Sequence, residues 1–177
     1  MLTLIIGDAS CGKSEYAENI IMKQRNRRIY LATMHPFGKE AKERIRRHRR
    51  QREGKGFFTV ECPKNLLKFA EEDIKKKEGL FVNSDILLED IPNLLANEMF
   101  DGDSAGCDID GILDGIGYIN EAASSLVIVT GNLFSGGSGY DKGTMEYLKA
   151  LAGLNRGIAL SADAVIEVVC GIPVRYK

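Results

Sequence analysis

The stretch that most constrains this chain is GDASCGKS at residues 7–14, which follows the apolar run LTLII and precedes a helical pattern. It fits G-x-x-x-x-G-K-S, in which glycines let backbone N–H groups surround phosphate oxygens at the N-terminus of a helix. We expect Lys13 to contact the outer phosphates and the Ser14 hydroxyl to bind Mg²⁺. A glycine turn that binds nothing is the alternative, and the flanking strand and helix patterns favour the phosphate loop. The loop residues predicted to contact a nucleotide are Gly7, Asp8, Ala9, Ser10, Cys11, Gly12, Lys13 and Ser14.

Short β-branched runs alternate with longer amphipathic segments along the whole chain, without an internal repeat or a low-complexity linker. This alternation predicts an α/β, three-layer fold like that of P-loop NTPases, with a mainly parallel sheet and helices on both faces. The length fits one nucleotide-binding domain over residues 1–177. We expect strands at 3–7, 28–33, 57–61, 79–89, 125–131 and 164–171. We expect helices that begin at Lys13, Glu40, Pro63 and Thr144, and helices through 92–100 and 109–119. The segments 100–108 and 131–143 are expected to be loops.

The composition excludes several classes of protein. With 44% hydrophobic and 28% charged residues, it is typical of a soluble globular chain. No run approaches the roughly 18 apolar residues of a membrane span, and nothing resembles a signal peptide. The four cysteines form no C-x-x-C pair, so neither a zinc site nor a disulfide framework is indicated. We therefore expect a cytoplasmic protein without a membrane or nucleic-acid partner.

A phosphate loop requires a second, acidic group to hold the metal. The apolar run DILLED ends in two acidic residues that could supply it. We expect Glu89, or alternatively Asp90, at the carboxyl end of this strand, facing the phosphates together with Ser14. Acids that end a strand are also common as solvated groups, which is the other interpretation. Glu61, which ends FFTVE, has a similar ambiguity, because a carboxylate there can accept the N1–H and 2-amino donors of guanine.

Residues 44–52, RIRRHRRQR, place one imidazole among six guanidinium groups. On a helix, Ala41, Ile45, His48 and Arg52 share one face, so the histidine is expected at the boundary between core and solvent. Two other interpretations stay open: a solvated basic helix without a chemical role, and an arm that binds nucleic acid. The arm is disfavoured because the run is short, contains no aromatic residue and belongs to a chain of net charge −1.

Taken in order, these segments resemble the bifunctional adenosylcobinamide kinase / adenosylcobinamide-phosphate guanylyltransferases of cobalamin biosynthesis. The resemblance runs nearly end to end, and an R-I-x-x-H-x-x-x-R helix after a strand ending in A-T is its most particular part. The matching segments are IIGDASCGKSEYAE, IYLAT, RIRRHRRQR, FFTVEC, ILLED followed by NLLANEMF, VIVTG, and LSADAVIEVVCGIPVRYK.

The resemblance implies a chemical task for the histidine. Enzymes of this family phosphorylate the aminopropanol hydroxyl of adenosylcobinamide, then transfer GMP to that phosphate through a guanylylated histidine that corresponds to His48. Neutral imidazole can attack the α-phosphorus of GTP, and we expect nearby cations to disfavour its protonation. The arginines that follow would stabilise charge on the transferring phosphate and the departing pyrophosphate. His35, in TMHPFG, is interpreted as a turn residue.

The residues predicted to contact the nucleotide beyond the phosphate loop come from four segments. They are Ala32, Thr33, Met34, Arg49, Arg50, Gln51, Arg52, Glu61 and Glu89, with Ser14 and Glu89 as the predicted metal ligands.

The chain departs from the family in the segment after the fifth predicted strand. The family usually carries T-N-E-V-G and then G-I-V-P there, whereas this chain has TGNLFSGGSGYDKG at 130–143. Where the family has an Asn-Gln pair, this chain has Asn155 and Arg156. We expect the corrinoid to approach these segments. The resemblance therefore supports the GTP and histidine half more firmly than the substrate half, and it leaves the survival of the kinase step open.

The resemblance further implies GTP or ATP as substrate, Mg²⁺ as cofactor, corrinoid acceptors and a homo-oligomer, a trimer as in family members. Two other classes of function remain as alternatives. One is a P-loop small-molecule kinase that uses only the γ-phosphate and leaves His48 idle. The other is a nucleotide-gated binding protein whose basic helix docks an acidic partner or nucleic acid.

Overall fold

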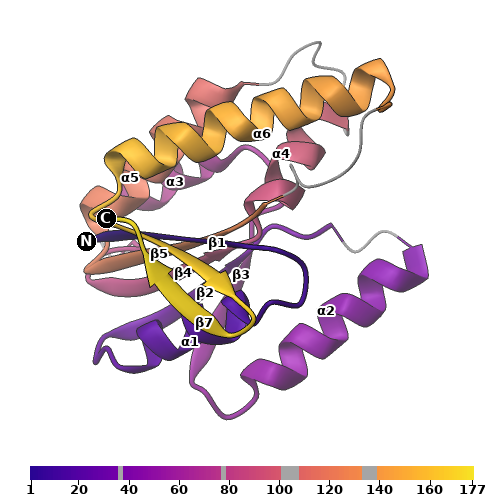
Figure 1. The fold of residues 1–177 in the computed structure, drawn as a ribbon. Coiled ribbons are helices and arrows are strands. Elements are labelled where there is room, and N and C mark those ends of the chain that lie inside the picture. The colour runs from indigo at the N-terminus through magenta and orange to yellow at the C-terminus, as the bar shows by residue number, and fades with distance from the viewer. Residues whose placement is uncertain (36–37, 77–78, 101–107, 133–138) are drawn as a thin grey trace.

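The computed structural model describes residues 1–35, 38–76, 79–100, 108–132 and 139–177, without the side chains of residues 40–42. Strands and helices alternate along most of the chain (Figure 1). The elements are β1 (Leu2–Gly7), α1 (Lys13–Met22), β2 (Arg27–Ala32), α2 (Gly38–Arg52), β3 (Phe57–Glu61), α3 (Leu66–Ile74), β4 (Ser84–Glu89), α4 (Ile91–Phe100), α5 (Ile109–Ala122), β5 (Ser125–Gly131), α6 (Lys142–Ser161), β6 (Ala164–Val169) and β7 (Ile172–Arg175).

Among the described residues, seven strands form one sheet in the order β3-β2-β4-β5-β1-β6-β7. Every neighbouring pair is parallel except β6 and β7, which form an antiparallel hairpin at one edge. The carboxyl ends of the parallel strands therefore lie along one edge, where open α/β sheets bind ligands. The order confirms the predicted mainly parallel sheet.

Helices cover both faces of the sheet, as predicted. The helices α3, α4, α5 and α6 lie on one side, and α1 and α2 lie on the other (Figure 1). The larger core fills the first side, and a smaller one, which includes Ile5, Ala17 and Val127, lies beneath α1. Every residue of β4 and β5 is buried, because parallel strands in the centre of a sheet are covered on both faces.

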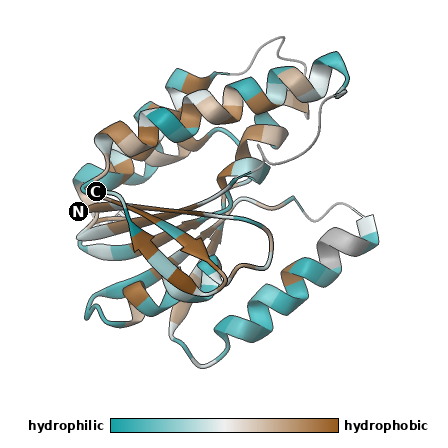
Figure 2. Ribbon diagram, in the orientation of Figure 1, coloured by the Kyte–Doolittle hydropathy of each residue, from teal (hydrophilic) through white to brown (hydrophobic). Residues whose placement is uncertain are grey.

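Helix α2 differs from the other helices. It is mostly hydrophilic along its length and extends away from the sheet toward its N-terminal end (Figure 2). Its C-terminal end returns to the sheet through Arg52, which is buried with 7% exposure. The helix thus lies over the carboxyl edge, with its last turns nearest the site.

The predicted strand at 79–89 is too long at its N-terminal side, since the strand begins at Ser84. The backbone N–H groups of Leu80 and Phe81 donate to the carboxylate of Asp73, each at 2.9 Å. These N–H groups are therefore used by the end of α3 and are not available for hydrogen bonds between strands. Phe81 still enters the core, which explains the misleading apolar run.

Three helix starts also shift. The helix predicted from Pro63 begins at Leu66, after Asn65 in a left-handed conformation with φ 55°. The helix predicted from Thr144 begins at Lys142, because the Asp141 side chain caps it by accepting from the Thr144 backbone N–H. The helix predicted from Glu40 begins at Gly38.

The last strand, β7, was not predicted. Residues Cys170 and Gly171 have φ values of 50° and 81°, so they close a tight turn after β6. The chain then returns antiparallel along β6. The predicted loops at 100–108 and 131–143 fall largely at 101–107 and 133–138, outside the described residues. In the described part of the chain, no helix is both long and apolar enough to cross a bilayer.

Candidate active site

The phosphate loop connects β1 to α1 at the carboxyl edge of the sheet. Ser10 and Gly12 have φ values of 60° and 93°, and Gly12 is the N-cap of α1. The Nζ of Lys13 donates to the carbonyl of Asp8 at 3.0 Å, so the lysine folds back over the loop. At Gly7, an added Cβ would lie 2.8 Å from the backbone oxygen of Val168, which explains glycine at that position. The motif thus has the strand, turn and helix that its sequence predicts.

Glu89 lies at the end of β4, beside the phosphate loop. Its Oε1 accepts a hydrogen bond from the Ser14 hydroxyl, and its Oε2 accepts one from the Tyr30 hydroxyl at 3.0 Å. The carboxylate is 5% exposed. Of the two acids in DILLED, Glu89 is therefore the one that lies against Ser14.

Asp90 has a different set of partners. Its Oδ2 accepts from the Asn93 amide at 2.7 Å and lies 3.6 Å from the Arg44 guanidinium. Burial raises the pKa of its carboxyl, the neighbouring Glu89 raises it further, and Arg44 opposes both effects. Its backbone N–H and carbonyl bond to the Thr33 hydroxyl, each at 2.8 Å. Thr33 is fully buried, and these bonds tie the end of β2 to the end of β4. Its side chain lines neither of the two cavities described below.

His48 lies on the inner side of α2, facing Glu89. Its Nδ1 is 3.9 Å from the Glu89 Oε1, and its side chain is 17% exposed. Burial lowers the pKa of the imidazole, Arg44, Arg52 and Arg47 lower it further, and Glu89 opposes them. The direction agrees with the prediction, but burial is the leading cause and the arginines come second.

Two cavities meet at this histidine. One lies over the phosphate loop and is lined by Ala9 to Glu15 together with Gln51. The other lies between α2 and the sheet. His48, Glu89 and Asp90 line both. The second cavity is further lined by Tyr30, Ala32, Met34, Ile45, Arg49, Arg52, Thr59 and Glu61.

Strand register explains the floor of the second cavity. Ala32 lies opposite Glu61 of β3 and opposite Glu89 of β4, and Tyr30 lies opposite Thr59. Since side chains alternate along a strand, all of these point to the face that α2 covers. Three neighbouring strands therefore present one residue set to the same cavity.

The arginines of α2 have separate positions. The Arg49 guanidinium pairs with Glu61 at 2.8 Å, and both side chains are more than half exposed. Arg52 is buried with its guanidinium carbon 3.2 Å from the centroid of the Tyr30 ring. Arg50 is exposed and lines a groove at the C-terminal end of α2, away from His48. The predicted contact by Arg50 is therefore the least supported by the geometry.

Sequence reasoning missed several residues of the site. Tyr30 touches Glu89 and Arg52, and Arg44 and Arg47 line the cavity over the phosphate loop. Ala32 was predicted to contact the nucleotide, and Tyr30 precedes it by two residues on the same strand. Because side chains alternate along a strand, Tyr30 points to the same side as Ala32, and this is the signal in the sequence that finds it. The predicted partner Ala41 has no described side chain, and His35 lies beyond β2, outside both cavities.

The geometry can be compared with known proteins. A model of the family described as cobinamide kinase / cobinamide phosphate guanyltransferase matches residues 3–176. The chain belongs to this family. It is therefore an enzyme of the kinase and guanylyltransferase type, of cobalamin biosynthesis, and it uses a nucleotide substrate. The expected family membership is confirmed.

Solved structures support the fold of this cobinamide kinase / guanyltransferase family member. The flagellar accessory protein FlaH from Methanocaldococcus jannaschii is 15% identical with a TM-score of 0.58, over 99% of this chain and 77% of that chain. A second solved structure, an ATPase domain, is 10% identical with a TM-score of 0.52, over 94% of this chain and 68% of that chain. Both likenesses concern the fold alone and confirm the P-loop NTPase-like class. No curated protein sequence matches the chain.

Proposed function

We propose that the enzyme transfers GMP from GTP to adenosylcobinamide phosphate through a covalent GMP adduct on His48. The observation that carries this proposal is the position of His48, which lines both the phosphate-loop cavity and the second cavity. A nucleotide with its outer phosphates on the loop and its base in the second cavity has its α-phosphorus between them. That position is beside the imidazole.

The imidazole is prepared for attack by its surroundings. Burial and three arginines lower its pKa, so the ring is neutral near pH 7. Its Nδ1 faces Glu89, which leaves Nε2 as the nitrogen with a free lone pair. Nε2 attacks the α-phosphorus, a P–N bond forms, and the bond to the β-phosphate oxygen breaks as pyrophosphate leaves. Glu89 stabilises the positive charge that develops on the ring.

Cations gather where the departing pyrophosphate collects negative charge. Lys13, Arg44 and Arg47 line the phosphate-loop cavity. Ser14 and Glu89 bring a hydroxyl and a carboxylate oxygen together, a donor set that fits Mg²⁺, and these two residues would hold it. Bound there with phosphate oxygens, Mg²⁺ would neutralise charge on the triphosphate.

We place the base at the second cavity because of the chemistry of its lining. Glu61 at its rim offers a carboxylate to the N1–H and 2-amino donors of guanine, which adenine lacks. In the second half-reaction, a phosphate oxygen of adenosylcobinamide phosphate attacks the GMP phosphorus. The P–N bond breaks and neutral imidazole returns. We further expect a homotrimer in the cytoplasm, as the family resemblance implies.

Labelled GTP tests the covalent step. The enzyme should retain label from α-labelled GTP through denaturing electrophoresis, and none from γ-labelled GTP. The adduct should be lost in acid and stable in base, as expected for a phosphoramidate. His48→Ala should abolish retention, whereas His35→Ala, the other histidine of the chain, should keep it. Label that persists in His48→Ala, or that survives acid, would reject the covalent role of this residue.

A further inference from the structure

Tyr30 lies beneath the site on β2 and contacts two of its charged groups at once. Its hydroxyl donates to the Glu89 Oε2 at 3.0 Å, and the Arg52 guanidinium carbon lies 3.2 Å from the centroid of its ring. The side chain is only 4% exposed. It lies in the segment IYLAT without a role predicted from the sequence, and the mechanism above gives it no task.

The hydroxyl fixes the carboxylate. Glu89 has its Oε1 bonded to Ser14 and its Oε2 bonded to Tyr30, so two donors from different elements hold its two oxygens. Without the bond from Tyr30, the Glu89 carboxylate is free to rotate away from Ser14 and His48.

The ring fixes the guanidinium. The Nη1 of Arg52 is buried and has no hydrogen-bond partner among the described residues, a costly arrangement for a charged group. The face of the Tyr30 ring stabilises this cation without using any of its donors. The ring is itself braced edge-on by Phe57, with centroids 6.4 Å apart and an interplanar angle of 81°. Arg52 is thus held in place at the wall of the second cavity.

We propose that Tyr30 is a positioning residue of the nucleotide site, whose hydroxyl orients Glu89 and whose ring orients Arg52. It acts through these two residues and needs no contact with the substrate. The proposal rests on the nucleotide site proposed above, but not on the covalent step.

Two substitutions at Tyr30 separate its two contacts. Tyr30→Phe keeps the ring and removes the hydroxyl, so GTP affinity in EDTA should be retained, while the gain on adding Mg²⁺ should fall about three- to tenfold. Tyr30→Leu also removes the ring, so affinity in EDTA should fall about tenfold as well. Calorimetric titration with GTP, with and without Mg²⁺, measures both. If Tyr30→Phe gained as much GTP affinity on adding Mg²⁺ as the wild type does, the role proposed for the hydroxyl would be overturned.

A double-mutant cycle tests the ring. Arg52→Met should cost much less GTP affinity in the Tyr30→Leu background than in the wild-type or Tyr30→Phe background. Additive losses would overturn the ring contact. If Tyr30→Leu does not fold, the Mg²⁺ measurement on Tyr30→Phe decides the proposal.

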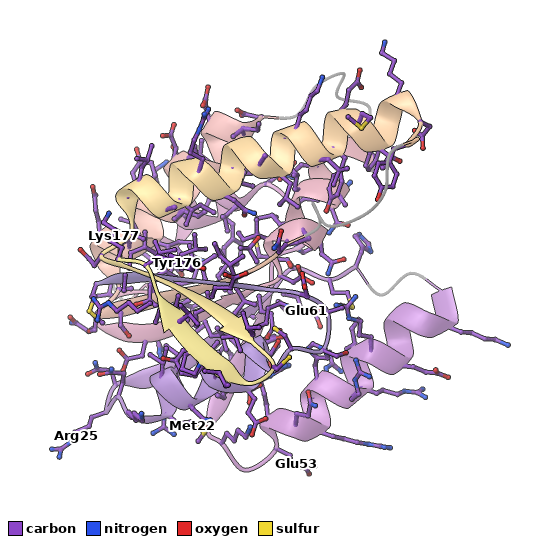
Figure 3. The ribbon with its side chains drawn as sticks, in the orientation of Figure 1. Met22, Arg25, Glu53, Glu61, Tyr176 and Lys177 are labelled. Atoms are coloured by element: carbon purple, nitrogen blue, oxygen red, sulfur yellow. The ribbon has the colours of Figure 1, made fainter. Side chains whose placement is uncertain are left out.

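Tyr176→Phe is the matched control. Its hydroxyl also donates to a carboxylate, Glu167, at 2.7 Å, and Figure 3 places Tyr176 far from Glu61 and the site. This variant should match the wild type in every titration. None of these titrations needs a GMP adduct. If the wild type retained no label from α-labelled GTP, the proposed transfer would be rejected. The titrations would still decide the role of Tyr30.

Discussion

The phosphate loop and helix α2 supply the two halves of the site, and the chain holds them in different ways. The loop follows β1, a strand flanked by two others in the sheet, and its geometry is set by backbone conformation at Ser10 and Gly12. Helix α2 is largely hydrophilic and meets the body through side chains (Figure 2). The shape of the phosphate loop is set by its backbone, whereas the position of His48, the proposed nucleophile, depends on individual side-chain contacts.

The contacts that hold α2 are unequal. The Arg49 to Glu61 pair is more than half exposed on both sides, and exposed pairs contribute little to stability. Arg44, which pairs with Asp90, is also half exposed. The buried stacking of Arg52 on Tyr30 is the contact least open to water. The last turns of α2, which carry His48, are therefore better anchored than its first turns.

The largest effect is expected on the loop side. Lys13→Ala should reduce GTP affinity roughly 10- to 100-fold, because a charge-assisted contact to the phosphates is lost. The unfolding midpoint should stay near wild type, since the loop is held by its backbone. Calorimetry with GTP measures the change, and Lys23→Ala at the far end of α1 is the matched control. Unchanged affinity in Lys13→Ala would remove the phosphate-loop assignment.

The acceptor side should separate the two reactions. The segment from Gly131 to Gly143 lacks the glutamate and proline usual in the family, so phosphorylation of adenosylcobinamide should be slow or absent compared with adduct formation. The Thr130 hydroxyl, near the end of β5, donates to the side-chain oxygen of Asn155 in α6 at 2.8 Å, and the Asn155 amide donates to the Gly131 carbonyl, so the asparagine side chain is occupied. Rates of both reactions on one preparation provide the check. Robust kinase turnover at micromolar corrinoid would show that the departure does not matter.

A smaller effect is expected at Glu61, at the rim of the second cavity. Glu61→Gln should reduce the preference for GTP over ATP by about tenfold, because one charged acceptor for guanine is lost. Competition between the two nucleotides for binding measures this preference. Glu53→Gln, on an exposed glutamate just after α2, should leave it unchanged. A wild-type preference in Glu61→Gln means that the base is read elsewhere.

The smallest effect is a shift in pH dependence. Adduct formation needs neutral imidazole, so its rate should rise with pH and level off near neutrality. Because burial and then Arg44, Arg52 and Arg47 lower the pKa of His48, against the opposing charge of Glu89, the midpoint should lie below the usual value of about 6.5. Salt should move the midpoint upward only slightly, since it screens the arginines and not the burial.

A matched pair of arginine variants checks the origin of that shift. Arg44→Gln removes a charge that acts on His48 and should raise the midpoint, whereas Arg46→Gln, on the exposed side of α2, should not. Equal midpoints in both variants would show that Arg44 contributes nothing to the shift.

The sequence predicts the phosphate-loop side of the site better than the side beneath α2. The phosphate loop, the parallel sheet and the place of Glu89 at the end of β4 follow from local patterns, and the structure has all three. The second cavity depends on the register of β2, β3 and β4, which no local pattern fixes. Strand alternation from Ala32 places Tyr30 on the same side of β2, but its contact with Glu89 depends on this register. Thr33 was expected in the site, and the structure shows its hydroxyl used by the backbone of Asp90.

The most direct test of the account is a chase of the isolated adduct. Enzyme labelled with α-labelled GTP, freed of nucleotide and mixed with adenosylcobinamide phosphate, should pass its label into the corrinoid product in a single turnover. That transfer should be at least as fast as the steady-state rate with GTP. Label that stays on the protein, while product forms from added GTP at the full rate, would contradict a covalent GMP on His48 as the intermediate.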